Sequence, residues 1–520
     1  MILLQIVFIG CSKSDFADNY TDPSKIQETT VEKQFTGFLQ SNKDYVLQKY
    51  WNYFTLLSPS VNTYNQAIGW VNSEKQYLTP SSGNESRWKD YYNFLAQERE
   101  FEKVFASQTA SKKTDNRIFM IAARIYFYDH TQKVVDIHGD IPWTEAGMLS
   151  ANSGDYSKSY AKFDDASTIY TKMLDDLKMF SDELNTITLS KDTNKAFRTQ
   201  DIVNRGDLTL WKKYCNSLRL RILTRVSAVA SFTSRADTEI ASILADQGKY
   251  PLILTNSDNV QINIFDSGSP LVSDYKTPEN WLEDGNGNIA GKVMIDHMNA
   301  NSDPRLKIMF EPGASAAGAY IGLDPMLLAG DQGSLVSGGT LAIYNRSTLS
   351  RNKNLPGVLI NSAEVQFLLA EYHLKNNIAT AKMDYEQGIR NSIEYYVTFR
   401  SISADNVSGP FVAPTATEIN NYLASAGVKF DVAATKDNLL KLIATQKWIH
   451  YSVMQPIESW AETRRLNVLN FNFWVDANGS QKTPPSRLIY PSSEQTYNTA
   501  NYAAVSAKDT HATKIFWDVK

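Results

Sequence analysis

Residues 362–396 read SAEVQFLLAEYHLKNNIATAKMDYEQGIRNSIEYY, and the spacing of their apolar side chains decides the fold class. The first stripe at helical spacing consists of Val365, Leu368, Leu369 and Tyr372. The second stripe consists of Tyr385, Ile389, Ile393 and Tyr396. Side chains at this spacing share one face of a helix, and a short polar join favours an antiparallel neighbour. The stretch therefore predicts a helical hairpin.

The same periodicity recurs earlier in the chain. A stripe over residues 207–226 consists of Trp211, Cys215, Leu218, Ile222 and Val226. Its spacing predicts a helix with Cys215 as a small buried side chain, and with Arg219, Arg221 and Arg225 turned away from the stripe. Asp164 and Asp165 precede a further stripe over 169–177, where acidic side chains favour a helix start.

These patterns predict a mostly α protein with a single body over residues 41–520. Helix pairs that resemble tetratricopeptide pairs form a scaffold over about 41–230 and 360–470. Between about 250 and 360 the chain is rich in Gly, Ser, Asn and Pro, with short extended candidates at 260–265 and 341–344. We expect this middle stretch, together with loops near the C-terminus, to form a second, irregular lobe with short strands.

Composition narrows the classes of function. The formal net charge is −4, so the chain lacks the basic field that nucleic-acid binding requires, and we exclude nucleic acid. Its 6 histidines are scattered without metal-ligand spacing, and we find no nucleophile or phosphate-binding motif. Neighbouring acidic pairs such as Asp164 and Asp165 cannot face each other across a cleft. We predict no enzyme, no metal and no cofactor, and we interpret residues 284–288 (DGNGN) as a turn rather than a calcium loop.

The N-terminus resembles a lipoprotein leader. Residues 1–10 (MILLQIVFIG) are apolar but too short to span a bilayer, and Cys11 follows small Gly10. We expect residues 1–11 to be a signal segment that ends at a lipidated Cys11, and residues 12–40 to be a flexible tether. The protein would then be anchored to a membrane by its lipid.

Several motifs, in this order, are similar to those of the SusD/RagB family of nutrient-binding outer-membrane lipoproteins, in particular its SusD-like members. They are residues 138–146 (HGDIPWTEA), 211–221 (WKKYCNSLRLR), 302–306 (SDPRL), 362–371 (SAEVQFLLAE), 460–465 (WAETRR) and 487–494 (RLIYPSSE). We interpret these motifs as structural, with Arg305, Arg464 and Arg465 in ion pairs with Glu364, Glu458 or Glu462.

The resemblance implies a scaffold of four tetratricopeptide-like helix pairs and a second lobe that carries much of the ligand surface. It also implies a position at the cell surface on the outer membrane, where the protein would deliver a nutrient to a SusC-like TonB-dependent transporter. The expected ligand is an oligosaccharide or polysaccharide.

Aromatic residues make up 12% of the chain, and aromatic faces with polar neighbours are what sugar rings stack on. Two loop-rich stretches combine both. The predicted ligand-binding residues are Tyr64, Asn65, Trp70, Trp88, Tyr275, Asn280 and Trp281.

Three alternatives remain open at this point. The same family contains binders of peptides or glycopeptides, which the residues do not distinguish from glycan binders. A scaffold that serves only protein contacts would bind no small ligand. An enzyme would have to release new reducing ends from a bound oligosaccharide.

Overall fold

The computed structural model describes residues 29–47, 49–264, 279 and 282–520. Most of these residues are helical. The helices of the N-terminal half are α2 (Val31–Ser41), α3 (Lys43–Val46), α4 (Tyr50–Asn52), α5 (Ser81–Ala106), α6 (Ala110–Asp115), α7 (Arg117–His138), α8 (Ala166–Thr186), α9 (Lys191–Gln200), α10 (Leu208–Val226) and α11 (Thr233–Ala245). A π-helix, η1 (Tyr53–Asn62), follows α4. Within this group, α8 packs closely against α10, and α2 packs closely against α5.

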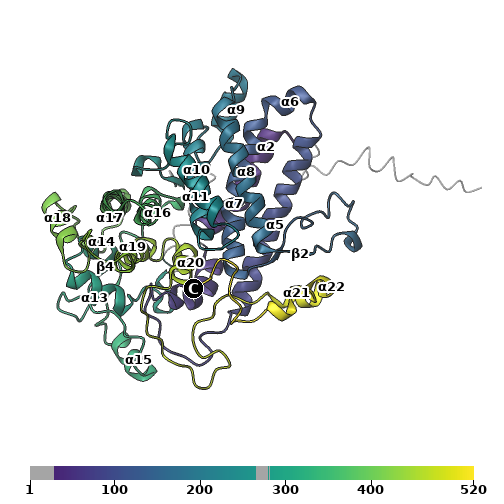
Figure 1. Ribbon diagram of the computed structural model, residues 1–520. Helices are drawn as coiled ribbons and strands as arrows, with labels where there is room; N and C mark the ends of the chain where they lie inside the picture. The colour runs from purple at the N-terminus through teal and green to yellow at the C-terminus, as the bar shows by residue number, and fades with distance from the viewer. Residues whose placement is uncertain (1–28, 48, 265–278, 280–281) are drawn as a thin grey trace, which may run out of the picture.

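A second group of helices lies at the other side of the molecule in Figure 1. It consists of α16 (Ser362–Leu374), α17 (Ile378–Ile402), α18 (Ala416–Ala424), α19 (Lys436–Tyr451) and α20 (Pro456–Leu466). Helices α16 and α17 form the predicted hairpin, and Gly388 lets them approach because a Cβ there would lie 2.6 Å from the Phe367 ring. Contacts of α10 with α16 and of α7 with α20 join the two groups into one scaffold.

The middle of the chain forms the irregular lobe that the sequence predicts. Its helices are α13 (Lys292–Ala300), α14 (Leu306–Met309) and α15 (Ala329–Ser337). The short strands form antiparallel pairs, β1 (Ile141–Pro142) with β2 (Phe163–Asp164), β3 (Val260–Ile262) with β6 (Gly357–Ile360), and β4 (Phe310–Glu311) with β5 (Ile343–Tyr344). The chain ends with α21 (Ser492–Tyr497), α22 (Thr499–Tyr502) and loops. The predicted mostly α fold class is confirmed.

Four short 3₁₀ turns connect the elements of the described chain, η2 (Tyr156–Lys158), η3 (Asn256–Asp258), η4 (Asp284–Asn286) and η5 (Ser506–Lys508). The residues that were predicted to form a turn at 284–288 thus include η4. Asp165 caps α8, because its side chain accepts hydrogen bonds from the backbone N–H groups of Ser167 and Thr168. Cys215 is fully buried, as its stripe predicts.

The tether predicted over 12–40 is corrected for residues 31–40, which belong to α2. Val31, Phe35, Phe38 and Leu39 are buried on one face of this helix. That face packs against α5 and α7, and Thr30 caps the helix through the Lys33 N–H. A four-residue apolar stripe in an otherwise polar segment is enough to dock the helix. Residues 1–28, and with them Cys11, lie outside the described residues.

The arginines of α10 are also placed differently from the prediction. Arg219, Arg221 and Arg225 are buried instead of turned away from the core. Arg221 donates to Asp129 of α7 at 2.8 Å and to Glu364 of α16 at 2.5 Å. Buried guanidinium groups are tolerated because each finds carboxylates on neighbouring helices.

This buried ion network extends to α19 and α20. Arg225 pairs with Glu458 and, at 3.0 Å, with Glu462. Lys447 lies 2.5 Å from Glu462, which Arg465 also contacts at 2.7 Å. The network therefore joins helices from both groups of the scaffold.

Of the three motif arginines Arg305, Arg464 and Arg465, only Arg465 forms an ion pair with one of the expected glutamates. Arg465 pairs with Glu462 as expected, whereas Arg305 pairs with Asp303 at 2.6 Å. Arg464 donates to the carbonyl oxygens of Ser486 and Asp136 at 2.7 and 2.8 Å, and its guanidinium lies over the Trp460 ring. The motif residues thus hold segments of the fold together.

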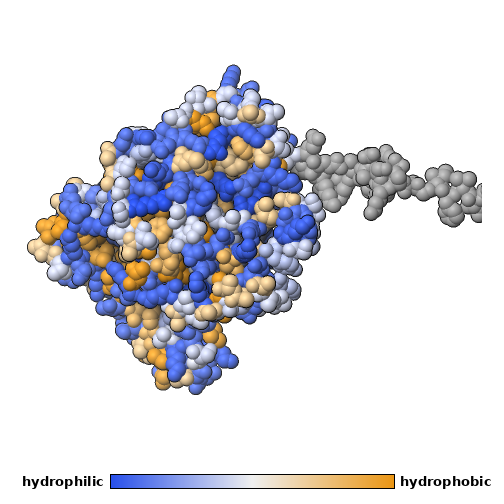
Figure 2. Space-filling model, turned by 45° about the vertical axis from the view of Figure 1, so that its right-hand side comes forward, coloured by the Kyte–Doolittle hydropathy of each residue, from blue (hydrophilic) through white to orange (hydrophobic). Residues whose placement is uncertain are grey.

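Hydrophilic residues predominate on the face drawn in Figure 2, where hydrophobic residues gather in patches. One patch is at the lower end, where Figure 1 places α15. Ile321, Met326 and Leu328, which precede α15, have large exposed fractions. Within the described ranges, none of the helices is long and apolar enough to cross a bilayer.

Candidate functional site

Three of the predicted ligand-binding residues are core residues. The exposed fractions of Tyr64, Asn65 and Trp88 are 2%, 0% and 4%. The Tyr64 ring lies 5.8 Å from that of Trp460, and the Trp88 indole donates to Glu494 at 3.0 Å. A buried side chain offers a ligand no free surface. These three side chains therefore lie beneath the surface of the protein.

The other predicted residues fall into two groups. Tyr275, Asn280 and Trp281 lie outside the described residues, and their role stays a prediction. Trp70 is half-buried, with part of its ring at the surface. It is therefore the one predicted ring in the described chain that could contact a ligand.

Trp70 ends a row of four neighbouring rings, which we call the aromatic run (Tyr50, Trp51, Phe54 and Trp70). Phe54 lies 6.4 Å from Trp70 between ring centres, and Tyr50 stacks on Phe54 at 5.0 Å. Trp51 meets Tyr50 edge-on at 5.7 Å and is 65% exposed. The run thus begins at a highly exposed indole and ends at a half-buried one.

The backbone explains why these rings are at the surface. Tyr50 and Phe54 are four residues apart on the segment where α4 passes into η1, so their side chains lie on the same side. The opposite side of η1 carries buried Tyr53, Leu56 and Leu57. Because those side chains anchor the segment in the core, Tyr50 and Phe54 are left at the surface. π-helical turns are rare and frequently occur at functional sites.

Trp70 is held by the irregular lobe. Ile68 pairs with Ala290 as an isolated β-bridge, and the Gly69 N–H donates to the Ile289 carbonyl at 2.8 Å. On the other side of Trp70, the backbone N–H of Asn72 donates to the side-chain oxygen of buried Gln332 at 2.7 Å. These bonds fix the chain on both sides of Trp70.

Gly69 has a packing role beside Trp70. A Cβ at this position would lie 2.6 Å from the Leu323 Cβ and 2.9 Å from the Ala290 carbonyl oxygen. No side chain larger than glycine's hydrogen fits there without a shift of the backbone, so glycine permits the close contact between the Trp70 loop and the lobe.

A shallow hollow adjoins the Trp70 ring, with an empty space of about 380 Å³ that includes open solvent. Its polar lining includes Gln66, Asn72, Gln76 and Lys292, and its apolar lining includes Tyr77 and Phe473. Gln66 donates to the Asn472 carbonyl at 2.5 Å, while its own side-chain oxygen is buried without a hydrogen-bond partner. The hollow thus places amide groups next to an aromatic face.

Tyr77 closes the inner side of this hollow. Its hydroxyl donates to the Trp474 carbonyl at 2.7 Å, and burial raises the pKa of this phenol above its ordinary value. The ring therefore stays neutral at physiological pH, and its hydroxyl is used to fix the loop around residue 474.

The arrangement suits binding by stacking and by hydrogen bonds at the ring edges. Sugars present a flat apolar face that is bordered by hydroxyl groups, and aromatic platforms flanked by amides match both features. Across the described ranges, no group of three or more His, Cys, Asp and Glu side chains is placed to hold a metal ion.

Sequence reasoning missed three of the four rings. Tyr50 and Phe54 have helical spacing, which is equally typical of a core stripe, and Trp51 lies between them. The signal that could have found them is the density of rings in residues 50–54 (YWNYF), which exceeds what one buried helix face can use.

Comparisons with known proteins find a family match over most of the chain. Residues 23–491 match the family SusD-like_2, whose description is "Starch-binding associating with outer membrane". None of the curated proteins matches the chain.

Solved structures share the fold over nearly the whole chain. A chitin-binding SusD homolog from Flavobacterium johnsoniae is 21% identical, with a TM-score of 0.70 over 94% of this chain and 99% of that one. A SusD homolog from Bacteroides fragilis is 19% identical, with a TM-score of 0.72 over 95% and 100% of the two chains. A SusD-like protein from Bacteroides thetaiotaomicron is 22% identical, with a TM-score of 0.67 over 94% and 99%. At these identities the likeness shows the fold alone.

Proposed function

Because the chain belongs to the SusD-like family of outer-membrane-associated starch-binding proteins, we propose that it binds an oligosaccharide or polysaccharide nutrient along the aromatic run. In this proposal the protein holds its ligand by stacking and edge hydrogen bonds and does not cleave it. The ligand enters the uptake system of the cell intact.

The observation that carries this proposal is the continuity of the aromatic run. Successive ring centres are separated by 5.7, 5.0 and 6.4 Å from Trp51 through Tyr50 and Phe54 to Trp70. Rings that pack only for stability are buried, whereas Trp51 is 65% exposed and gains little from its neighbours. A glycan chain can use several such rings at once, because each sugar unit offers a similar face.

The hollow beside Trp70 supplies the hydrogen-bonding part of the site. Within its lining, Gln76 and Lys292 are partly exposed and can bond to a sugar hydroxyl, whereas the unpaired Gln66 oxygen lies buried below them. Stacking on the run and hydrogen bonds to these edge groups together favour a polyhydroxyl ligand.

A ligand panel tests the proposal. The purified protein is titrated by calorimetry with chito-oligosaccharides, malto-oligosaccharides and a peptide pool. Saturable binding of at least one glycan is expected. Binding of peptides alone would favour the rival function, a binder of peptide or glycopeptide nutrients. New reducing ends after incubation with a bound glycan would show that the protein is an enzyme.

Binding alone does not bring a nutrient into the cell, so we also propose a partner. A SusC-like TonB-dependent transporter would receive the ligand, with the scaffold of helix pairs as the docking surface, since stacked helix pairs present broad rigid faces. A lipid on Cys11 would hold the protein at the cell surface. Tyr275, Asn280 and Trp281 remain proposed ligand-binding residues.

The partner is tested by a pull-down of the tagged protein from native membranes in mild detergent, followed by mass spectrometry. A transporter is expected among the captured proteins. Repeated capture of the ligand-competent protein without a transporter would refute delivery to a transporter. A free-standing adhesin would then be the better interpretation.

The anchor is tested with Cys11→Ala. This variant should fold and bind ligand as the parent does, yet leave the membrane fraction after a carbonate wash, because acyl chains provide the attachment. Retention of Cys11→Ala in the washed membranes would show that another feature holds the protein there.

A further inference from the structure

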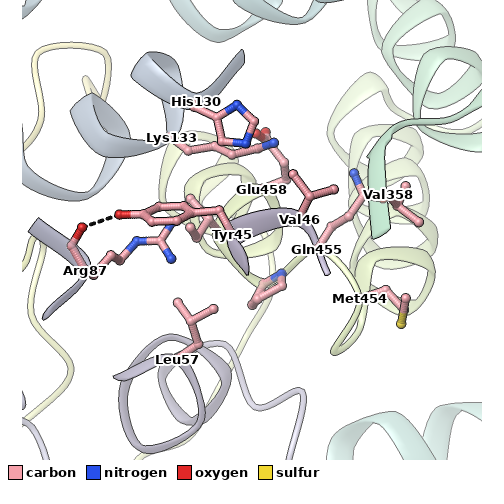
Figure 3. A pocket seen from close by; sticks show the side chains of 12 residues that line it. Tyr45, Val46, Leu57, Arg87, His130, Lys133, Val358, Met454, Gln455 and Glu458 are labelled. Atoms are coloured by element: carbon pink, nitrogen blue, oxygen red, sulfur yellow. Dashed lines mark hydrogen bonds between the residues drawn. The ribbon is translucent and has the colours of Figure 1, made fainter. Parts of the chain in front are cut away.

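A second cavity lies where α3, α5, α7 and η1 meet the turn between α19 and α20. The empty space there is about 440 Å³, part of which is open to solvent. Figure 3 shows Tyr45 and Arg87 on one side of this cavity, His130 and Lys133 above it, and Met454 and Gln455 opposite. Two of these side chains, Arg87 and Lys133, are cationic.

Arg87 is a buried cation without a carboxylate partner. Its exposed fraction is 4%, and no carboxylate in the described chain lies within ion-pair distance of its guanidinium. One nitrogen donates to the Asn52 side chain, and the guanidinium lies 4.2 Å from the centre of the Tyr45 ring. Its Nε is buried with no hydrogen-bond acceptor.

This situation is costly for the fold. Burial lowers the pKa of the Arg87 guanidinium, and the influence of Tyr45 and then of Asp90 only partly opposes this effect. Three of the other buried arginines, Arg221, Arg225 and Arg305, have carboxylate partners. A buried charge without a partner is strongly destabilising, so a counter-ion beside Arg87 would be favourable.

The α7 side of the cavity carries the second positive charge, that of Lys133. Lys133 lies 2.7 Å from Asp129 and keeps 15% of its side chain exposed. His130 next to it is neutral, since burial, and then the charge of Lys133, lower its pKa to about 3. Arg87 contributes to the same lowering of the pKa.

One carboxylate, Glu458, also borders the cavity. Its two oxygens are occupied, because Gln132 donates to one at 3.0 Å and Arg225 donates to the other. The Gln455 side chain is likewise engaged with Glu364 at 2.9 Å and with Asn361 at 2.7 Å. The Arg87 Nε therefore remains a donor without an acceptor, because the oxygens of Glu458 and Gln455 already accept other hydrogen bonds.

We propose that this cavity binds a small anion, a carboxylate or an inorganic oxyanion, between Arg87 and Lys133. Planar oxyanions match the donor geometry of a guanidinium, and a charge-assisted bond to the Arg87 Nε would satisfy its unpaired donor. The anion would join the α5 and α7 helices to the α19–α20 turn. None of the four rings of the aromatic run lines this cavity.

The test uses the full chain in a buffer whose background anion is chloride, which is neither a carboxylate nor an oxyanion. Sodium acetate and sodium sulfate are titrated separately at constant ionic strength, and melting temperature and calorimetric heat are recorded. Acetate or sulfate should give a saturable rise in melting temperature with one site, because a ligand of the native state stabilises it by mass action. The acetate and sulfate arms distinguish a carboxylate from an inorganic oxyanion.

Arg87→Met should abolish this saturable response, whereas Arg198→Met, at an exposed arginine, should retain it. If Arg87→Met does not fold, Lys133→Met serves as the second variant and should weaken the response at least tenfold. A wild-type protein that shows no saturable response, or an equal response in Arg87→Met, would overturn the proposal and leave a water-filled cavity.

Discussion

Phe54 lies directly against Gly285, so that a Cβ at residue 285 would come within 3.0 Å of the Phe54 ring. Gly285 belongs to η4 of the irregular lobe and has a φ of 58°, a conformation that side chains disfavour. Phe54 belongs to the π-helix of the scaffold. This contact brings the two parts of the molecule together beneath the middle of the aromatic run.

Gly285→Ala should therefore weaken glycan binding. The added methyl group would displace the Phe54 ring and interrupt the run between Tyr50 and Trp70. We expect an affinity loss of about threefold to tenfold, which corresponds to one stacked ring. Gly154→Ala is the matched control, because Gly154 also has a positive φ, of 82°, but no neighbour within 4 Å. Equal losses in both variants would mean that backbone strain, and not the Phe54 contact, is responsible.

The buried ion network predicts a large difference between two arginine substitutions. Arg221→Met leaves Asp129 and Glu364 without their main partner in the core and should cost about 3–5 kcal/mol of unfolding free energy. Arg117→Met breaks a half-exposed pair with Glu183 and should cost at most about 1 kcal/mol. Urea denaturation measures both, and similar costs would contradict the structural role assigned to the network.

Two buried histidines predict a loss of stability in mild acid. Burial lowers the pKa of His130 and of His450 to about 3, below the ordinary value of 6.5. The unfolded chain therefore takes up protons between pH 6.5 and 3 that the folded chain does not, so stability falls as the pH falls through this range.

At pH 5 each of these histidines should cost about 2 kcal/mol relative to pH 7. His450→Gln should remove one such contribution, so the loss of unfolding free energy between pH 7 and pH 5 becomes smaller in this variant. Denaturant titrations at the two pH values provide the comparison. An unchanged difference in His450→Gln would show that its protonation does not govern the acid sensitivity.

The helices of the scaffold could be predicted because each shows apolar side chains at helical spacing in the local sequence. The α16–α17 hairpin and buried Cys215 follow from side chains at helical spacing alone. The burial of Arg221 and Arg225 could not be inferred in this way, because their carboxylate partners lie on α7, α16 and α20. Helix α2 was missed because its four apolar residues stand among polar ones.

The site was predicted only in part for a similar reason. The loop position of Trp70 showed that a helical stripe does not explain its ring. Trp88 also looked accessible in the sequence, but α5 turns it into the core. Which ring faces solvent depends on how η1 is anchored by Leu56 and Leu57, and this is a tertiary property.

Calorimetric titration of the Trp51→Ala variant with the tightest glycan from the panel tests the central claim most directly. Trp51 is 65% exposed, so its removal should leave the melting temperature almost unchanged while affinity falls about threefold to tenfold. Tyr497→Ala is the matched control, since Tyr497 is 74% exposed and lies outside the aromatic run, and its affinity should equal that of the parent. An unchanged affinity in Trp51→Ala, or an equal loss in Tyr497→Ala, would contradict glycan binding along the aromatic run.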